Sequence, residues 1–595
     1  MPVYRAPLKE YRFIIEEFLR LERFAEVPGY ADAAGETLAV FLDSAARICE
    51  GVAQPLNQPG DLEGCRWEAG EVRTPKGFRE AYRRFADDGW IGLALDTVYG
   101  GKGLPGVLAE SFAEMLAAAN LAFSGYIELS EAVFSALHAH GSEAQKRLYL
   151  PKLASGEWTG AMHLTEAHAG SDLRLIRTRA VPQADGSYRI HGTKSFITNA
   201  EHDLAANIVN VVIARIPGSP EGSGGVSLFV VPKFLPQADG GLGPRNALEC
   251  ASIEHKMGLR AAPTGVIHYH GAHGWLVGEV NHGLRAMFTM VNDARLGVAL
   301  QGLSQAEVAC QNAIHYARER RQGRALAPAA DLPDPVPIIE HPDVRRMLMT
   351  MRAFTEAARG LGLWVALQID LAKRHPDAAE RARADRLAAL MTPVIKAHFT
   401  DWGSEAANLA LQCFGGYGFI EDTGVEQFVR DVRITQIYEG TNGIQSLDLV
   451  RRKLSLGAGA GVREFFALLG QSIAAAEGDA ALADIAQALR TALSSLGQAT
   501  AWMQQRAGGD VTAAAGGATD YLRLFGLVSL GWVWLEYARI GAAAVSQGRG
   551  DLAFHRHKLA LGRFYARRIL PEASMLLARA TLGAADLIEL AGEDL

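Results

Sequence analysis

The chain has 595 residues, of which 49% are hydrophobic and 21% are charged, and its formal net charge is −7. This balance is typical of a globular protein and excludes a disordered or fibrous chain. No polybasic segment stands out, so nucleic acid is not expected as a partner. The five cysteines are widely spaced without a CxxC pair, which argues against a disulfide framework or a zinc site.

Residues 1–17 alternate apolar and charged side chains, and they lack the continuous apolar core of a secretory signal. Together with the cysteine pattern, this predicts a cytoplasmic protein. The most apolar stretch, residues 524–535, is shorter than the roughly 20 residues needed to span a bilayer. It is expected to be part of a buried helix.

Changes in hydrophobic periodicity divide the chain into four expected domains. Apolar residues recur at helical spacing over residues 1–159, and short β-branched runs between Gly, Pro and Asp-Gly turns occupy residues 160–283. Helical spacing returns over residues 284–456. A Gly/Ala-rich segment at 457–461 is typical of a linker, and residues 462–595 are expected to form an additional helical domain. The expected fold class is mainly α, with a β domain between helical domains.

The first candidate binding block is residues 164–172, LTEAHAGSD, where the helices give way to strands. Thr165 and Ser171 offer hydroxyl groups there, and the small residues between them let the backbone approach a ligand. The alternative is a tight turn in which Asp172 caps a short helix.

The second block, residues 192–199, reads GTKSFITN. Phe196 and Thr198 are two residues apart, so in a strand their side chains point to the same face. Such a face can stack on a flat ring and donate one hydrogen bond to it. The alternative is an ordinary core strand.

The third block combines residues 412–418, QCFGGYG, with Arg430-Asp431 and residues 437–445, IYEGTNGIQ. Glu439 stands between apolar residues and glycine, a setting that suits a base acting on a carbon acid. The alternative is a glutamate that caps a helix beside a glycine turn.

These blocks, in this order, resemble the acyl-CoA dehydrogenase family over about residues 8–454. Further matches are Gln145-Lys146, residues 149–151 (YLP), residues 256–258 (KMG) and residues 316–320 (YARER). The resemblance implies an N-terminal helical domain, a central β-barrel domain and a helical bundle, with FAD bound where these meet and partly by a neighbouring subunit. It also implies a homodimer or a dimer of dimers, and electron-transfer flavoprotein as the partner that reoxidises the flavin.

By the same resemblance, Glu439 is the catalytic base, which removes the α proton of an acyl-CoA thioester while a hydride leaves the β carbon for FAD. The implied FAD contacts are Met162, Leu164, Thr165, Phe196, Thr198, Arg320, Gln412, Phe414, Gly415, Gly416 and Thr441. The implied acyl-CoA contacts are Ser171, Arg295, Tyr438 and Gly440. Arg295 has an alternative as a surface charge of a helix. No metal is implied.

The chain departs from the family pattern at three places. Phe196 stands where most members have Trp, so its ring can still stack but the indole donor is lost. Residues 321–324, RQGR, lack the family's aromatic, so the loop that approaches the adenosine is expected to differ. Gly443 follows Asn442, so no polar side-chain contact to FAD is expected from Gly443.

The start of the chain, residues 3–8 (VYRAPL), the missing aromatic and the additional C-terminal domain resemble one branch of the family. The acyl group is then expected to be 3-methylthiopropanoyl or a fatty acyl chain. Two other functions stay open. The motifs do not separate a dehydrogenase from an acyl-CoA oxidase, which passes electrons to oxygen. A flavin- or CoA-binding protein without catalysis is the second alternative, and Glu439 within YEGTNGIQ argues against it.

Basic and aromatic residues gather in the C-terminal domain. They are Trp532, Trp534, His555, Arg556, His557, Lys558, Arg563, Arg567 and Arg568. This combination suits either a solvated helix face or a membrane-surface patch, because basic residues with aromatics favour anionic lipid.

Overall fold

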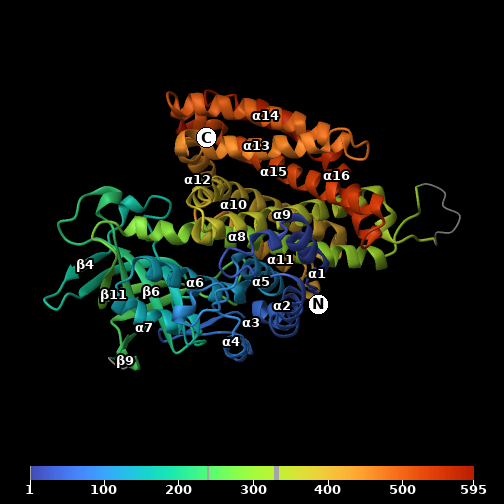
Figure 1. Ribbon diagram of the computed structural model, residues 1–595. Coiled ribbons are helices and arrows are strands. Elements are labelled where there is room, and N and C mark those ends of the chain that lie inside the picture. Colours follow the sequence, from blue (N-terminus) through green and yellow to red (C-terminus); the bar gives the residue numbers. More distant parts are fainter. Residues whose placement is uncertain (1, 32, 238–239, 327–333, 595) are drawn as a thin grey trace. The chain divides into compact units, whose positions relative to one another are not determined.

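The computed structural model describes residues 2–31, 33–237, 240–326 and 334–594, with the side chains of residues 288–293 left aside. The chain forms two compact units (Figure 1). The first, here called the helical unit, comprises Met1–Asp43, Gly106–Glu114 and Val298–Leu595. The second, called the sheet unit, comprises Ser44–Pro105 and Met115–Gly297.

The helical unit is built on long, largely apolar helices. Its N-terminal segment carries α1 (Leu8–Arg12), and α2 (Gly35–Ile48) and α5 (Gly106–Ala119) begin within the unit. The helices that follow are α8 (Gly283–Glu319), which starts in the sheet unit, α9 (Pro342–Arg374), α10 (Ala378–Phe414), α11 (Glu426–Val432) and α12 (Asn442–Asp448). A three-residue turn joins α9 to α10, and Asp377 caps α10 by accepting a hydrogen bond from the Ala379 N–H at 2.7 Å.

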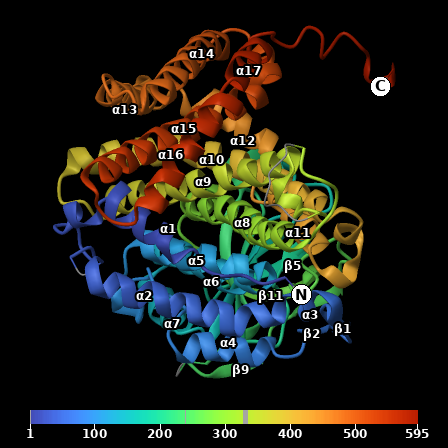
Figure 2. The ribbon, with the colours of Figure 1, turned by 90° about the vertical axis from the view of Figure 1, so that its right-hand side faces the viewer.

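Five further helices complete this unit: α13 (Ala460–Ala476), α14 (Ala483–Ala507), α15 (Val511–Gln547), α16 (Leu552–Arg568) and α17 (Glu572–Ala580). Helices α15 and α16 lie against α9 (Figures 1 and 2). Residues 524–535 are buried within α15, as predicted, because this helix is apolar on all sides. Trp534 anchors it to α9 by donating its indole N–H to the Ala353 carbonyl at 2.9 Å.

The membrane-surface patch considered for this region is wrong. Trp532, Trp534 and Lys558 are buried, so they cannot form a lipid-facing surface. The solvated-face alternative holds only for the exposed Arg556, Arg567 and Arg568. Among the described residues, no helix is both long enough and apolar enough to cross a membrane.

A buried charged cluster links α1, α9 and α16 of the helical unit. Lys558 of α16 donates to Glu10 of α1 and, at 2.6 Å, to Glu356 of α9. Arg359 of α9 lies between two further buried carboxylates, at 2.7 Å from Glu114 and 2.9 Å from Glu307. Buried charges of this kind persist because each finds an opposite charge and hydrogen bonds.

The sheet unit contains α3 (Asn57–Glu63), α4 (Phe78–Asp87), α6 (Leu121–His140) and α7 (Glu143–Ala154). Its strands are β1 (Arg66–Glu68), β2 (Glu71–Arg73), β3 (Trp158–His163), β4 (Arg179–Pro182), β5 (Tyr188–Thr198), β6 (Asn207–Ala214), β7 (Ser227–Pro232), β8 (Phe234–Pro236), β9 (Leu242–Arg245), β10 (Leu248–Ile253) and β11 (Thr264–Val277). The main sheet has the order β3-β6-β7-β11-β5-β4, with β10 also paired to β11. Among the ladders between the described strands, β3 with β6 is the parallel one, and an isolated parallel bridge joins Arg179 to Arg215.

The prediction of a β-barrel is wrong, because the sheet is not closed. In the described part of the chain, the end strands β3 and β4 form no ladder with each other. The ladder between β11 and β5 shifts register twice, with an extra residue in β5 between Lys194 and Ile197 and an extra residue in β11 between His270 and Ala272. The first part of β11 therefore pairs with β5 and β10, and its last residues pair with β7. These bulges curve the sheet without joining its ends.

Acid sensitivity is predicted for the sheet unit because two of its histidines are buried in the neutral form. Burial, with Lys194 nearby, lowers the pKa of His163 to about 3, and burial, with Lys233 nearby, does the same for His202. The unfolded chain binds more protons below pH 6.5, so the free energy of unfolding should fall as pH falls from 6.5 towards 3. Each histidine contributes about 1.4 kcal/mol per pH unit.

Urea unfolding at pH 7.5, 6.5 and 5.5 checks this, with His163→Gln as the comparison. Between pH 6.5 and 5.5 the free energy of unfolding of the variant should fall less steeply than that of the wild type. The difference in slope should be about that of one bound proton, roughly 1.4 kcal/mol per pH unit. An unchanged pH dependence in His163→Gln would show that His163 is not buried neutral.

Candidate active site

Glu439 lies in a strained turn between the 3₁₀ segment Arg433–Gln436 and α12. Its backbone has a φ of +54°, and Gly440 follows with a φ of +85°. A non-glycine residue with positive φ is uncommon, and such residues concentrate at functional sites. The Glu439 side chain is half-buried. The turn thus presents a carboxylate from a backbone conformation that the surrounding structure must maintain.

The residues around Glu439 are held by side chains of the same unit. Thr441 caps α12, with its hydroxyl accepting from the Ile444 N–H at 3.4 Å. The idea that Glu439 itself caps a helix is therefore wrong. The Tyr438 hydroxyl donates to the Gln301 side-chain oxygen. Gln445 donates to the Gly440 carbonyl at 3.0 Å.

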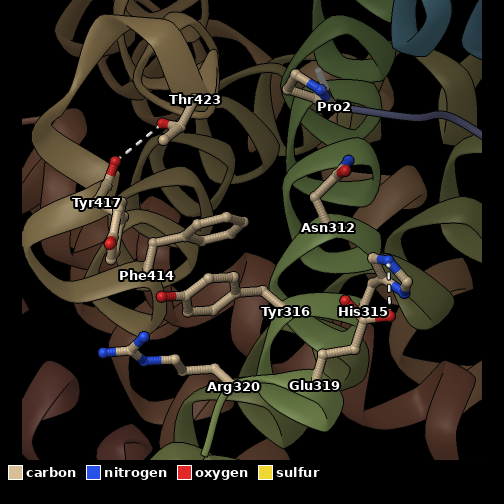
Figure 3. A pocket seen from close by; sticks show the side chains of 9 residues that line it. All are labelled: Pro2, Asn312, His315, Tyr316, Glu319, Arg320, Phe414, Tyr417 and Thr423. Atoms are coloured by element: carbon tan, nitrogen blue, oxygen red, sulfur yellow. Dashed lines mark hydrogen bonds and ion pairs between the residues drawn. The ribbon is translucent and has the colours of Figure 1, made fainter.

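A pocket of about 490 Å³ opens beside α8 and the end of α10 (Figure 3). Its lining consists of Pro2, Asn312, His315, Tyr316, Glu319, Arg320, Phe414, Tyr417 and Thr423. The Tyr316 and Phe414 rings stack at 4.2 Å between centroids and 17° between planes. The Arg320 guanidinium lies 5.7 Å from the Tyr417 ring centroid. The pocket therefore offers flat aromatic surfaces beside a cation that can meet phosphate oxygens.

Arg320 and Phe414 are predicted ligand contacts, whereas Tyr316 and Tyr417 are not among the contacts predicted from the sequence. Tyr316 could have been found from its spacing, because residues i and i+4 of a helix lie on one face and Arg320 follows it by four. Tyr417 lies in the 3₁₀ segment Gly415–Phe419, and no local pattern indicates which way its ring points.

Gly415 ends α10 with a φ of +59°, which a glycine adopts without strain. A Cβ added at Gly415 or at Gly416 would meet no atom within 4 Å, so both glycines border open space. Gln412, one turn earlier, is exposed. This stretch leaves backbone accessible next to the pocket end of α10.

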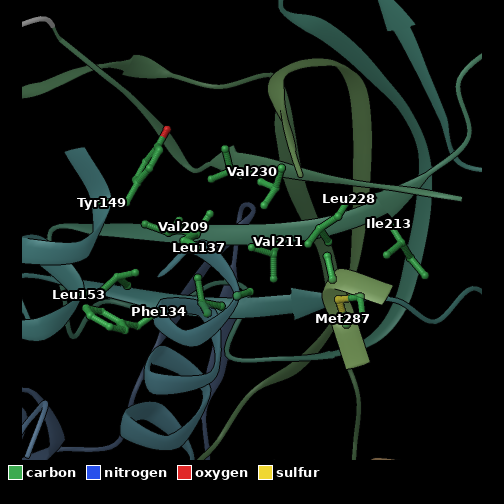
Figure 4. Close-up of a cluster of buried hydrophobic side chains, with 14 of the residues drawn as sticks. Phe134, Leu137, Tyr149, Leu153, Val209, Val211, Ile213, Leu228, Val230 and Met287 are labelled. Carbon is green, nitrogen blue, oxygen red and sulfur yellow. The ribbon is translucent and has the colours of Figure 1, made fainter. Parts of the chain in front are cut away.

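The predicted contacts outside the pocket and the Glu439 turn belong to the sheet unit, whose strands are anchored in a buried core. Val209 and Val211 of β6 and Leu228 and Val230 of β7 pack in this core with Phe134 of α6 (Figure 4). Fully buried strands of this kind have little freedom to shift, because interiors are close-packed. They provide a rigid base for the loops at their ends.

Lys194 of β5 brings the first two sequence blocks together. It is fully buried, and its ammonium donates to the Leu164 carbonyl at 2.9 Å and to Glu166 at 3.0 Å. The Ser195 N–H donates to the Thr165 carbonyl at 3.0 Å. Burial lowers the pKa of Lys194 to about 8, opposed by Glu166. Leu164 and Thr165, in the loop after β3, are thereby fixed against Lys194 and Ser195, which directly precede Phe196 in β5.

Phe196 is not a core residue, so the reading of an ordinary core strand is wrong for it. Its ring is 61% exposed and its φ is +59°. The pairing of β5 with β11 shifts register between Lys194 and Ile197, which marks a bulge at this point. The neighbouring Ile197 is buried, whereas Thr198 is half-buried. The bulge therefore aims an aromatic ring outward.

Two predicted acyl-CoA contacts also lie in the sheet unit. Ser171 is exposed, two residues before the 3₁₀ segment Leu173–Leu175. Asp172 caps that segment by accepting from the Arg174 N–H at 3.0 Å, so the cap described in the alternative interpretation of this block is present. Arg295 lies in α8 and is only 6% exposed. The alternative that Arg295 is a surface charge is therefore wrong.

Comparison with known families accounts for nearly the whole chain. The acyl-CoA dehydrogenase N-terminal, middle and C-terminal domain models match residues 40–157, 161–272 and 281–454. A model described as acetyl-CoA dehydrogenase C-terminal like matches residues 462–591.

The similarity to individual proteins also extends over nearly the full length of this chain. The chain is 42% identical to 3-methylmercaptopropionyl-CoA dehydrogenase of Ruegeria pomeroyi, covering 97% of this chain and 98% of that protein. It is 32% identical to the broad-specificity linear acyl-CoA dehydrogenase FadE5 of Mycobacterium tuberculosis, covering 96% of each. The fold is similar to that of Caenorhabditis elegans ACDH-11 in complex with C11-CoA, with a TM-score of 0.76 at 20% identity over 95% of this chain and 91% of that one.

The chain belongs to the acyl-CoA dehydrogenase family and is an oxidoreductase. Members of this family use FAD to dehydrogenate acyl-CoA thioesters. The additional helices α13–α17 correspond to the C-terminal model that this chain matches beyond residue 461.

Proposed function

We propose that this chain converts an acyl-CoA to the 2-enoyl-CoA, with Glu439 as the base and electron-transfer flavoprotein as the electron acceptor. The observation that carries the proposal is the Glu439 turn. A half-buried carboxylate is held there at a φ of +54°, in the segment that resembles the family's catalytic turn. The proposed oligomer is a homodimer or a dimer of dimers, and the proposed location is the cytoplasm.

In this proposal Glu439 removes the α proton of the thioester. That proton is weakly acidic, so the charge that develops on the carbonyl oxygen needs fixed donors, and the Glu439 backbone N–H is one candidate. Bound FAD supplies the acceptor for the hydride that leaves the β carbon. Tyr438 and Gly440 flank the base and are proposed to contact the acyl-CoA, together with Ser171 and Arg295.

The residues proposed to hold FAD form two sets, one in each unit. In the helical unit, the pocket beside Arg320 and Phe414 fits a planar ring joined to phosphate, because it combines stacked aromatics with a guanidinium. Gln412, Gly415, Gly416 and Thr441 complete this set. In the sheet unit, the outward ring of Phe196 fits the face of a flavin, with Met162, Leu164, Thr165 and Thr198 around it.

Arg320→Ala is expected to weaken FAD retention. A charge-assisted hydrogen bond to phosphate contributes about 1.5–3 kcal/mol, so the Kd for FAD should rise roughly 10- to 150-fold. Titration of apoprotein with FAD, followed by flavin fluorescence, measures this. Arg318→Ala is the matched control, since Arg318 is exposed at the end of α8, two residues before Arg320, and outside the pocket lining. Equal Kd values in the two variants would remove Arg320 from the FAD site.

The proposed acyl group is 3-methylthiopropanoyl or a linear fatty acyl chain, supported by the relatives that act on such substrates. Steady-state assays with acyl-CoAs of graded length, including 3-methylthiopropanoyl-CoA, and with electron-transfer flavoprotein as acceptor test this. Oxygen uptake at the same rate without added acceptor would instead assign an oxidase.

A further inference from the structure

We propose that Lys396 of α10 is a positioning residue for Glu439, fixing the turn in which that base lies. The inference rests on the proposed function, because it concerns the same carboxylate. Lys396 is fully buried. Its ammonium donates to the Gly440 carbonyl at 2.9 Å and to the Asn442 side-chain oxygen at 3.0 Å. A buried cation thus reaches the residue directly after the base.

The hydrogen bonds from Lys396 are part of a larger set that fixes the two peptide groups after Glu439, those of the Glu439 and Gly440 carbonyls. Gln445 donates its amide to the Gly440 carbonyl at 3.0 Å and to the Glu439 carbonyl at 3.3 Å. Because each peptide group is planar, fixing a carbonyl also fixes the following N–H. The two carbonyls together therefore constrain the backbone angles on the C-terminal side of Glu439.

Side chains of α10 also bind Asn442. Its amide donates to Asp401 at 2.7 Å and to the Thr400 hydroxyl at 2.9 Å. Lys396 and Thr400 are four residues apart and so lie on one face of α10, and Asp401 directly follows Thr400. The start of α12 is thus fastened to a long, buried helix, and the Glu439 turn is fastened at its C-terminal end.

The strain at Glu439 explains why such fastening is needed. A positive φ at a non-glycine residue costs of order 1–3 kcal/mol and persists only where its surroundings over-determine it. Without the Lys396 ammonium, the Gly440 carbonyl loses a charged donor and the turn can relax. The carboxylate then moves relative to the substrate's α carbon, and a shift of about 1 Å is enough to cost on the order of 100-fold in rate.

Lys396→Met tests this in the FAD-loaded, full-length protein. Anaerobic stopped-flow mixing with saturating acyl-CoA gives the flavin reduction rate, and its substrate dependence gives the concentration for half-maximal rate. We expect the rate to fall roughly 10- to 100-fold, with that concentration and the FAD content little changed. Thr392→Ala is the control, since Thr392 is buried one turn earlier in α10 and bonds only the Ala388 carbonyl among the described contacts. It should reduce at the wild-type rate.

A double-variant cycle separates positioning from general stability. If Lys396 acts through Glu439, then Lys396→Met should slow the Glu439→Gln protein by less than about 3-fold, because the base is already gone. Effects that multiply fully, or a wild-type rate in Lys396→Met, overturn the inference. If Lys396→Met yields no soluble holoprotein, Lys396→Gln is measured in the same way and judged by the same outcomes. Slow reduction in Glu439→Gln with normal reduction in Lys396→Met would sink this inference alone, whereas normal reduction in Glu439→Gln would sink the proposed function.

Discussion

Glu439→Gln should bind acyl-CoA and stay yellow while its flavin reduction slows by roughly 10²- to 10⁴-fold, the range expected when a general base is lost. Glutamine keeps the shape and the polar contacts of the side chain but cannot accept the α proton. The positive φ at this position is expected to be retained, because Lys396, Gln445 and Thr441 constrain the residues that follow Glu439. Binding and chemistry are therefore separated by this one substitution.

The measurement is anaerobic mixing of the variant with substrate, following flavin bleaching by stopped flow against the wild type. Acyl-CoA binding is measured in parallel, from the perturbation of the flavin spectrum. Glu421→Gln is a suitable control, since it removes an exposed carboxylate nearby in sequence that lies outside the catalytic turn. If Glu439→Gln bleaches at the wild-type rate, Glu439 is not the base and the proposed mechanism fails.

Lys558→Met is expected to destabilise the helical unit by about 3–5 kcal/mol, the cost of breaking a buried ion pair by removing one partner. Lys558 is fully buried and lies against both Glu10 and Glu356. Its removal leaves two carboxylates facing each other without their shared cation. The rings of Phe13, Tyr537 and Phe554, which lie 4.8–5.2 Å from this ammonium, cannot replace it.

The loss of stability caused by Lys558→Met should be smaller at lower pH. In the native protein, burial and Glu356 already raise the pKa of Glu10 above its usual value, opposed by Lys558. Without the cation that pKa rises further. A carboxyl group whose folded pKa is raised stabilises the fold at low pH and loses that contribution as pH rises through the folded pKa. The deficit of Lys558→Met relative to the wild type should therefore shrink from pH 8 to pH 6.

Urea unfolding at both pH values provides the test. Lys9→Met is the matched control, because Lys9 pairs with Asp551 and so joins the same two segments of the chain, but at an exposed position. Exposed ion pairs contribute little, so Lys9→Met should have a much smaller effect at either pH. Equal destabilisation by the two variants would show that burial of the Lys558 cluster adds nothing to stability.

Much of the candidate site could be predicted from the sequence because its motifs are local. Phe196 and Thr198 fall in one strand, and residues 437–445 contain the base, its flanking residues and the Thr441 cap in nine positions. The structure also shows what the local pattern could not indicate. Lys194 joins the loop at Leu164 to β5 across thirty residues, and Lys396 reaches Gly440 across forty-four.

The C-terminal domain shows most clearly what could not be predicted from the sequence. From the sequence, Lys558 was expected on a solvated or membrane-facing surface, because a run of His, Arg and Lys is strongly polar. In the structure its partners are Glu10, 548 residues away, and Glu356, 202 residues away. These three residues are too far apart in the chain for any local sequence pattern to include them. Charged side chains are buried in this way only when they are paired. The run was therefore assigned to the wrong environment.

The sequence by itself determined the family, the order of the motifs, the helical nature of most of the chain and the identity of the candidate base. These follow from residue type and short spacing, which act through local sterics and hydrogen bonding. Tertiary structure alone decided that the sheet stays open, that Lys396 and Lys558 are buried, and that Tyr316 and Tyr417 line a pocket with Arg320. Each of these depends on contacts between segments far apart in the chain, whose free energy is gained only when the whole unit packs.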